Sequence, residues 1–225
     1  MFGWVLRYRL GLLVIAWIAV SGCEMLPPQL SRAMVTPYKP HNTFAWGATL
    51  PSQIRRVALF PVACDEVRLE AVEGRDALEP VVLAELMKTH KFEVIQVTPE
   101  ALRSKTGRAS WSCEEALPAD LLDWVCQSCN CDAVLFCKLT AFRGYAPLAV
   151  GWRMRLVDAH TRTTVWACDE VFDAGLPSVQ VAARQYRNTA GQNATGPADS
   201  WGMENSPRQF GQYAAAQLLG TLPGL

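Results

Sequence analysis

The stretch RMRLVDAHTRTTVW, residues 153–166, decides the fold of this chain. Arg153 and Arg155 alternate with Met154 and Leu156, and a period of two is typical of a strand that has one buried and one exposed face. A polar turn follows, and then a second run of β-branched and aromatic residues. We therefore predict an antiparallel hairpin with arms at 149–157 and 163–172.

Further strands and helices surround this hairpin. We expect buried strands at 55–62, 92–97 and 133–140, and helices at 77–90, 98–104, 118–126, 179–186 and from 206 onward. Thr98 and Ser206, each followed by proline, are expected to cap helices, as is Asp76. Pro80 is expected in the first turn of its helix, and Asp158 is expected to support its own turn. Two strand–helix crossovers followed by a meander predict an α/β (α+β) fold, a single mixed sheet of about five strands with a C-terminal antiparallel hairpin and helices packed on it.

The first 22 residues have the pattern of an export signal. Arg7 and Arg9 precede an apolar run at Leu10–Val20, which is shorter than the roughly 20 residues that a membrane-spanning helix needs. The sequence Val20-Ser21-Gly22-Cys23 then resembles the lipobox of bacterial lipoproteins. In that family the signal is removed before the cysteine, whose thiol becomes a diacylglyceryl thioether. The alternative is an ordinary signal peptide or a short anchor, with Cys23 incidental.

The resemblance to lipoproteins implies an organisation in three parts. We expect a signal peptide at 1–22, a lipidated Cys23 with a proline-rich tether at 23–51, and an α/β periplasmic domain at 52–225 that has a mobile loop at 188–205 and a C-terminal helix. The lipid would hold the protein on a membrane without spanning it. Glu24 follows the cysteine where aspartate would favour retention in the inner membrane, so the expected place is the outer membrane, facing the periplasm.

The composition excludes two broad classes. Lys and Arg number 21, Asp and Glu also number 21, and the formal net charge is zero. A neutral chain without a basic block lacks the electrostatic footprint of a nucleic-acid-binding protein. Half of the residues are apolar, which is incompatible with a disordered chain.

A second resemblance concerns the pattern of the folded part. The opening strand at 56–61, the strand at 92–95, the run Cys131-Asp132-Ala133-Val134-Leu135-Phe136 and the hairpin together resemble a family of bacterial periplasmic lipoproteins. This family includes the curli-secretion lipoprotein, the penicillin-binding-protein activator lipoproteins and, more distantly, the amino-terminal domain of the Tol-system β-propeller protein. The resemblance covers residues 54–172 and implies a partner in an envelope machine, because members form pores, activate synthases or assist polysaccharide and flagellar assemblies.

The cysteines form the sharpest local feature. Cys126, Cys129 and Cys131 form a C-x-x-C-x-C pattern, and Cys113 could join them. Three thiolates near a helix end can hold zinc or an iron–sulfur cluster, but complete structural zinc sites usually show two C-x-x-C halves. An oxidising compartment favours disulfides instead. Disulfides, free structural thiols and a metal site therefore stay open, and no other cofactor is expected.

No catalytic motif of a known hydrolase, zinc protease or nucleotide-binding loop occurs, so we predict that the protein is not an enzyme. Arg143, Tyr145 and Arg153 are predicted to form a contact patch, because Tyr and Arg are favoured at interface centres. The predicted function is that of a lipid-anchored accessory protein that binds, or self-assembles with, an export, surface-structure or wall-synthesis machine. The alternative is a metal-binding or thiol-redox lipoprotein that uses the cysteine cluster.

Overall fold

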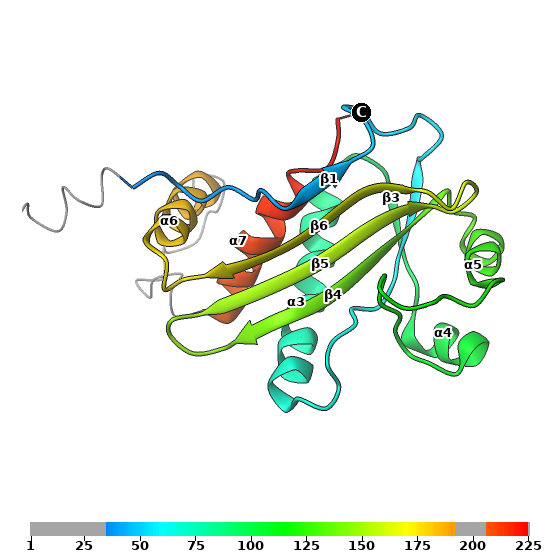
Figure 1. Ribbon diagram of the computed structural model, residues 1–225, viewed down its shortest axis with the longest axis horizontal. Helices are drawn as coiled ribbons and strands as arrows, with labels where there is room; N and C mark the ends of the chain where they lie inside the picture. The colour runs from blue at the N-terminus through cyan, green and yellow to red at the C-terminus, as the bar shows by residue number, and fades with distance from the viewer. Residues whose placement is uncertain (1–34, 192–205, 225) are drawn as a thin grey trace, which may run out of the picture. The chain divides into compact units, whose positions relative to one another are not determined.

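The computed structural model describes residues 35–191 and 206–224. The expected signal peptide, Cys23 and most of the loop expected at 188–205 lie outside the described residues. Within them, one six-stranded mixed sheet carries five helices (Figure 1). The predicted fold class is therefore confirmed, with one strand more than the five expected.

The sheet has a parallel part and an antiparallel part. Its strands are β1 (Thr43–Ala45), β2 (Arg56–Leu59), β3 (Glu93–Gln96), β4 (Ala133–Arg143), β5 (Ala149–Asp158) and β6 (Thr164–Asp173). Their order across the sheet is β1-β6-β5-β4-β2-β3. β2 pairs in parallel with β3 and β4, as helical crossovers require, and the other pairs are antiparallel. The predicted hairpin is the pair β5–β6.

The first face of the sheet is covered along its length. Helices α3 (Leu69–Lys88) and α7 (Pro207–Leu219) pass behind the sheet in Figure 1, and α6 (Pro177–Gly191) lies beside them. From the sheet, Trp152, Met154 and Leu156 enter the core on this side, as the alternation predicts. Gly211 of α7 packs so tightly on Leu78 of α3 that a Cβ there would lie 2.3 Å from a Leu78 methyl carbon. The two helices can approach this closely because that position has no side chain.

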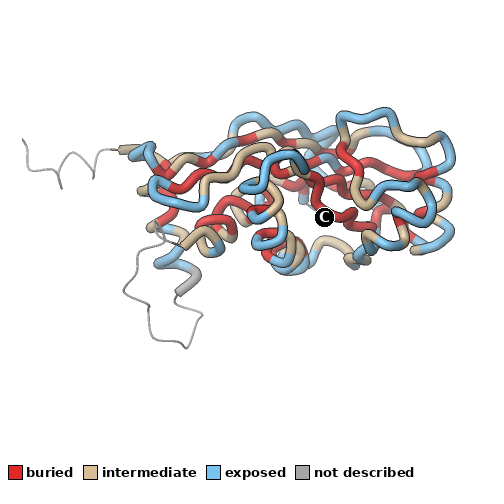
Figure 2. Tube along the Cα trace, turned by 90° about the horizontal axis from the view of Figure 1, so that it is seen from below, coloured by how far each residue is buried: buried red, intermediate tan, exposed pale blue. Residues whose placement is uncertain are grey.

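The second face is covered over only half of the sheet. Helices α4 (Pro99–Thr106) and α5 (Leu121–Cys129) pack with the connecting segment 107–120 over β2 and β4. β2 is therefore buried on both faces, with Val57 in one core and Ala58 in the other. In Figure 2 buried residues run through the interior of the molecule, with exposed residues on both sides. Among the helices of residues 35–191 and 206–224, none lies over the second face of β5 and β6.

The folded part begins earlier than expected. Residues 36–51, which we call the N-terminal strap, were expected in the tether but pack on the sheet and include β1. The Glu170 carboxylate of β6 holds the strap: it accepts hydrogen bonds from the Tyr38 hydroxyl (2.7 Å) and from the backbone N–H groups of His41 (2.8 Å) and Asn42 (3.0 Å). Glu170 is only 6% exposed. Burial by itself raises the pKa of Glu170, but these hydrogen bonds outweigh it and lower the pKa below its ordinary value of 4.5.

Local signals marked some element ends correctly and others wrongly. Thr98 and Ser206 cap α4 and α7 through their side chains, and the Asp158 carboxylate accepts two N–H bonds in its turn, as predicted. The prediction for Asp76 and Pro80 was wrong, because α3 starts at Leu69 and both residues lie inside it. Packing explains the longer helix. Gly74, in the added part, lies directly against the Phe142 ring of β4, and such burial outweighs one lost backbone hydrogen bond. Among the described residues, no helix is both long and apolar enough to cross a bilayer.

Replacing Glu170 by glutamine should loosen the strap. We expect the free energy of unfolding at pH 7 to fall by about 2–4 kcal/mol, because hydrogen bonds to a charged acceptor contribute about 1.5–3 kcal/mol each and the amide keeps part of them. Urea unfolding followed by tryptophan fluorescence measures this change. The exposed Glu73 provides the matched control, and Glu73→Gln should change the stability by less than about 0.5 kcal/mol.

The difference in stability between the wild type and Glu170→Gln should depend on pH. Because the folded-state pKa of Glu170 is lowered, its stabilisation is present above about pH 4.5 and is lost as the pH falls through the folded-state pKa. The wild type and Glu170→Gln should therefore converge in stability below pH 4.5. Equal stability of the two proteins at pH 7 would contradict the role given to this carboxylate.

Candidate ligand groove on the open half of the sheet

A groove of about 570 Å³ lies on the second face of the sheet. Its floor comes from β5 and β6, and its sides come from β1 and from the segment that leads to α5. It is lined by Asn42, Thr43, Phe44, Cys113, Glu114, Arg153, Met154, Arg155, Thr164, Ala167, Cys168 and Asp169. The lining thus combines charged groups with apolar surface, as small-molecule and peptide sites do.

The floor is organised by a row of charges across three strands. Lys138 of β4 is paired in register with Arg153 of β5, which is paired with Asp169 of β6. Two cations on adjacent strands repel each other unless an anion compensates them. Arg153 donates to the Asp169 carboxylate from Nε (2.8 Å) and Nη2 (2.5 Å). The Glu114 carboxylate forms ion pairs with both Lys138 and Arg153.

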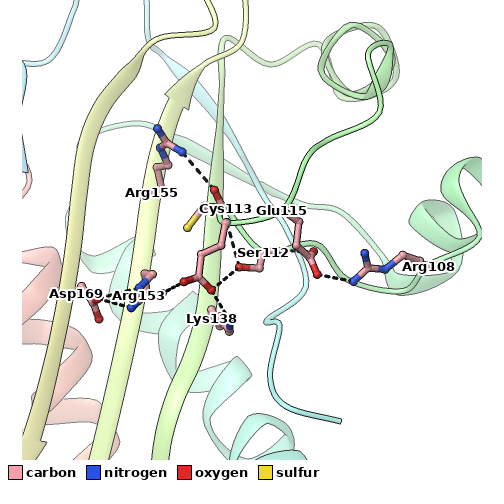
Figure 3. A network of polar contacts seen from close by, with 9 residues as sticks. Arg108, Ser112, Cys113, Glu115, Lys138, Arg153, Arg155 and Asp169 are labelled. Atoms are coloured by element: carbon pink, nitrogen blue, oxygen red, sulfur yellow. Dashed lines mark hydrogen bonds and ion pairs between the residues drawn. The ribbon is translucent and has the colours of Figure 1, made fainter.

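Glu114 reaches the floor from a segment that is fixed against the protein, and Figure 3 shows its neighbours Arg108, Ser112 and Glu115. Arg108 donates to Glu115 over 2.8 Å and stacks on the Trp111 ring at 4.3 Å from the ring centre. Glu115 in turn accepts from the Ser112 N–H over 3.0 Å. Burial raises the pKa of Glu115, but these two donors outweigh burial and lower it. The side of the groove is therefore an ordered segment in which Glu115 is a carboxylate at neutral pH.

Arg155 differs from its neighbour Arg153 in the partners it meets. Its Nε donates to the Thr164 hydroxyl (2.8 Å) and its Nη1 to the Cys113 carbonyl (3.2 Å), so both of these acceptors are neutral. A guanidinium carries five N–H donors and keeps its charge at any physiological pH. Phe44, 48% exposed, lies on the same face of the sheet. This side of the groove can bind a carboxylate beside an apolar side chain.

The structure separates the three residues that were predicted to form a contact patch. Arg143 and Arg153 lie on the same face of the sheet, but Arg143, near the β4–β5 turn, is held by the Pro147 carbonyl and by Asp173 (2.9 Å). Tyr145 is 66% exposed in that turn. Arg153 lies in the groove, in the ion pairs described above. Arg143 and Arg153 therefore share one face of the sheet, Tyr145 lies in the turn, and the three residues do not form one cluster.

The structure also divides the four predicted cysteines into two groups. Cys126, Cys129 and Cys131 come together at the end of α5, whereas Cys113 lies in the groove near Arg155. All of the cysteines in the described range are free thiols. Burial raises the pKa of each of these four, and that of Cys131 reaches about 12. Over residues 35–191 and 206–224, no group of three or more His, Cys, Asp or Glu side chains is placed to hold a metal ion.

Most of the groove residues were not predicted from the sequence, and Arg155 and Glu114 show why. Arg155 could have been included, because it lies two positions after Arg153 in the same strand and alternation puts both on one face. Glu114 has no such signal. It comes from an irregular segment, 24 residues from Lys138 in the chain, and only the fold brings the two together.

Comparisons with solved structures find similarities of fold alone. No protein-family model matches the sequence, and no curated protein is similar to it. A PelC dodecamer from Paraburkholderia phytofirmans is similar in structure, with 15% identity, coverage of 81% of this chain and 96% of that chain, and a TM-score of 0.48. Lipoprotein GNA1162 from Neisseria meningitidis has 14% identity, covers 63% of this chain and 99% of its own, and has a TM-score of 0.43.

The LpoB C-terminal domain from Escherichia coli is also similar. It has 16% identity, covers 52% of this chain and 81% of its own length, and has a TM-score of 0.33. The resemblance predicted from the sequence thus has counterparts in solved structures at the level of the fold. These similarities concern the fold, and what the groove can bind follows from the residues of this chain.

Replacing Glu114 by glutamine should leave Lys138 and Arg153 adjacent without their shared anion. We expect a loss of about 1 kcal/mol in the free energy of unfolding at low salt, a modest value because all three side chains are about one-third exposed. The loss should shrink at 1 M salt, since screening weakens the repulsion between the cations. Urea unfolding at both salt concentrations measures it, with the exposed Glu66→Gln as control. A loss that does not depend on salt would contradict the electrostatic role.

Proposed function

We propose that this protein is a lipid-anchored, non-enzymatic accessory protein of the bacterial cell envelope. It binds, or self-assembles with, an export, surface-structure or wall-synthesis machine. The observation that carries the proposal is the N-terminal pattern, in which two arginines and a short apolar run precede Val20-Ser21-Gly22-Cys23. Lipid on Cys23 would anchor the folded domain, and Glu24 after it favours the outer membrane, facing the periplasm.

The open half of the second sheet face is the proposed contact surface. Arg155 and Phe44 in the groove offer a cation beside an aromatic ring, and Tyr145 extends the exposed surface toward the β4–β5 turn. Arg143 and Arg153 border this surface but already bind carboxylates. Tyr and Arg side chains contribute strongly to protein interfaces. A partner segment that has a carboxylate next to an apolar side chain fits this surface.

The alternative, a metal-binding or thiol-redox lipoprotein, has one observation in its favour, the gathering of Cys126, Cys129 and Cys131. Thiol-redox catalysis needs a thiolate, which a lowered pKa provides. In this protein burial raises the pKa of all three thiols. This difference supports the accessory role over the redox role.

Replacing Cys23 by serine tests the anchor. We expect wild-type protein in the membrane fraction, with an incorporated fatty-acid label, and Cys23→Ser without label and out of the membrane fraction, because serine has no thiol to form the thioether. Fractionation, labelling with an alkyne palmitate analogue and mass measurement of the mature N-terminus give the result. Cys64→Ser is the matched control and should keep the label. Labelled Cys23→Ser protein would contradict lipidation at this residue.

A photo-crosslinking amino acid in place of Phe44 tests the contact surface in intact cells. We expect one discrete crosslinked species, identified by mass spectrometry as another envelope protein or as a second copy of this chain. Its yield should fall at least about five-fold in Arg155→Ala and stay unchanged in Arg187→Ala, which removes an exposed arginine on α6. The same amino acid at Met87, which is exposed on α3, should not produce this species. Equal crosslinking from both positions would contradict a specific surface.

A further inference from the structure

The end of α5 brings two cysteines together by its backbone conformation. The helix ends at Cys129, and Asn130 follows in the left-handed conformation (φ 49°, ψ 50°). When a helix ends with a left-handed residue, the next residue in the chain commonly packs on the side chain that lies four positions before the left-handed residue. Here those two residues are Cys131 and Cys126. Their proximity is therefore a direct result of how the helix ends.

The side chains agree with this geometry. The Cys126 and Cys131 side chains interact with each other, and Cys129 also lies close enough to Cys131 for its charge to raise the pKa of that thiol. The Cys129 thiol additionally interacts with the Arg56 guanidinium, whereas Cys126 has no such cationic partner among the described residues. Cys131 is 3% exposed, and Cys126 is partly exposed. Cys113, the other candidate partner, is held in the groove through its carbonyl bond to Arg155.

Cys131 is also held in place from its other side. The next residue, Asp132, donates its N–H to the Arg56 carbonyl (2.8 Å), and its carboxylate accepts from the N–H groups of Arg55 and Arg56 (2.9 Å each). These bonds fix the start of β4 against β2. The Cys131 side chain therefore stays directed at the end of α5 while Cys126 remains accessible.

We propose that Cys126 and Cys131 form a disulfide bond in the folded protein, and that Cys129 stays a free thiol beside it. This bond is a structural link between α5 and β4, and it does not depend on the partner that the protein binds. It rests on the proposed function only in needing export to an oxidising compartment, where disulfides persist.

The oxidation is a thiol–disulfide exchange in two steps. The more accessible Cys126, as thiolate, attacks a small disulfide such as oxidised glutathione, or the disulfide of a thiol oxidoreductase, and releases one thiol. Cys131, as thiolate, then attacks the Cys126 sulfur of the mixed disulfide and releases the second thiol. Two S–H bonds are lost, one S–S bond forms, and the two electrons and two protons end on the reduced co-reactant. The raised pKa values of these thiols make the exchange slow, as suits a bond that forms once and persists.

Thiol trapping on the purified full-length chain tests the proposal. The protein is incubated with oxidised glutathione, and the remaining free thiols are alkylated with a first label. The disulfides are then reduced, and the thiols they release are alkylated with a second label. Cleavage before aspartate places all three cysteines in fragment 123–131. We expect two second labels in the wild-type fragment and also two in Cys129→Ser. The Cys126→Ser and Cys131→Ser fragments should form no internal disulfide and should therefore have at most one second label, released from an unresolved mixed disulfide with glutathione. A Cys129→Ser fragment without second label would overturn the pairing, and so would a wild-type fragment without it.

Two further measurements exclude other outcomes. Urea unfolding should show a higher midpoint for the oxidised wild type than for the reduced wild type. In Cys131→Ser the two treatments should give the same midpoint. The reduced Cys131→Ser protein should unfold at the same midpoint as the reduced wild type. Elemental analysis of the protein purified under reducing conditions should find no stoichiometric zinc. Stoichiometric zinc in the wild type that is lost in Cys126→Ser would overturn the proposed disulfide and indicate a metal site instead. Because the oxidation is done on purified protein, its failure counts against the thiol pair alone, whereas failure of Cys23 labelling counts against the anchor alone.

Discussion

The pairing of β5 between β4 and β6 is the constraint on which the other parts of this molecule depend. Side chains alternate along β5, so Met154 enters the core on the first face while Arg153 and Arg155 lie on the second. A slip of one residue in either pairing would bury the arginines and expose the core. Burying two guanidinium groups without partners carries a large free-energy cost, and exposing the core side chains of β5 adds to it. The register therefore determines where the groove forms and which charges line it.

The same register explains why the N-terminal strap belongs to the domain. Alternation along β6 directs Glu170 to the first face, where it is paired with Trp152 of β5 and lies among core residues. A buried carboxylate is tolerated only when donors satisfy it. The strap supplies three of these donors from Tyr38, His41 and Asn42, and β1 then extends the sheet beside β6. This part of the segment that was expected to be a tether is thus held by a carboxylate more than 120 residues away in the sequence.

This distance separates what the sequence could predict from what it could not. The hairpin, the caps at Thr98 and Ser206 and the Asp158 turn depend on residues a few positions apart, and all were predicted correctly. β1 has three residues and no periodicity of its own, and its stability comes from pairing with β6 and from Glu170. The start of α3 depends on contact between Gly74 and Phe142, on different elements. In the groove, strand alternation indicates Arg153 and Arg155, but the position of Glu114 depends on the path of an irregular segment.

The charges of the groove favour contact over catalysis. A carboxylate that acts as a general base needs its oxygen free to take a proton, and one that acts as an acid needs a raised pKa. Glu114 is held by two cations, Asp169 accepts two bonds from Arg153, and Glu115 has a lowered pKa. These acidic groups serve to compensate the cations and to fix the segment that forms one side of the groove. The polar capacity that is left lies on Arg155, whose charge meets only neutral oxygens among the contacts of the described residues. A rigid groove whose acids are occupied and whose remaining charge is a guanidinium is suited to recognising a carboxylate on a partner.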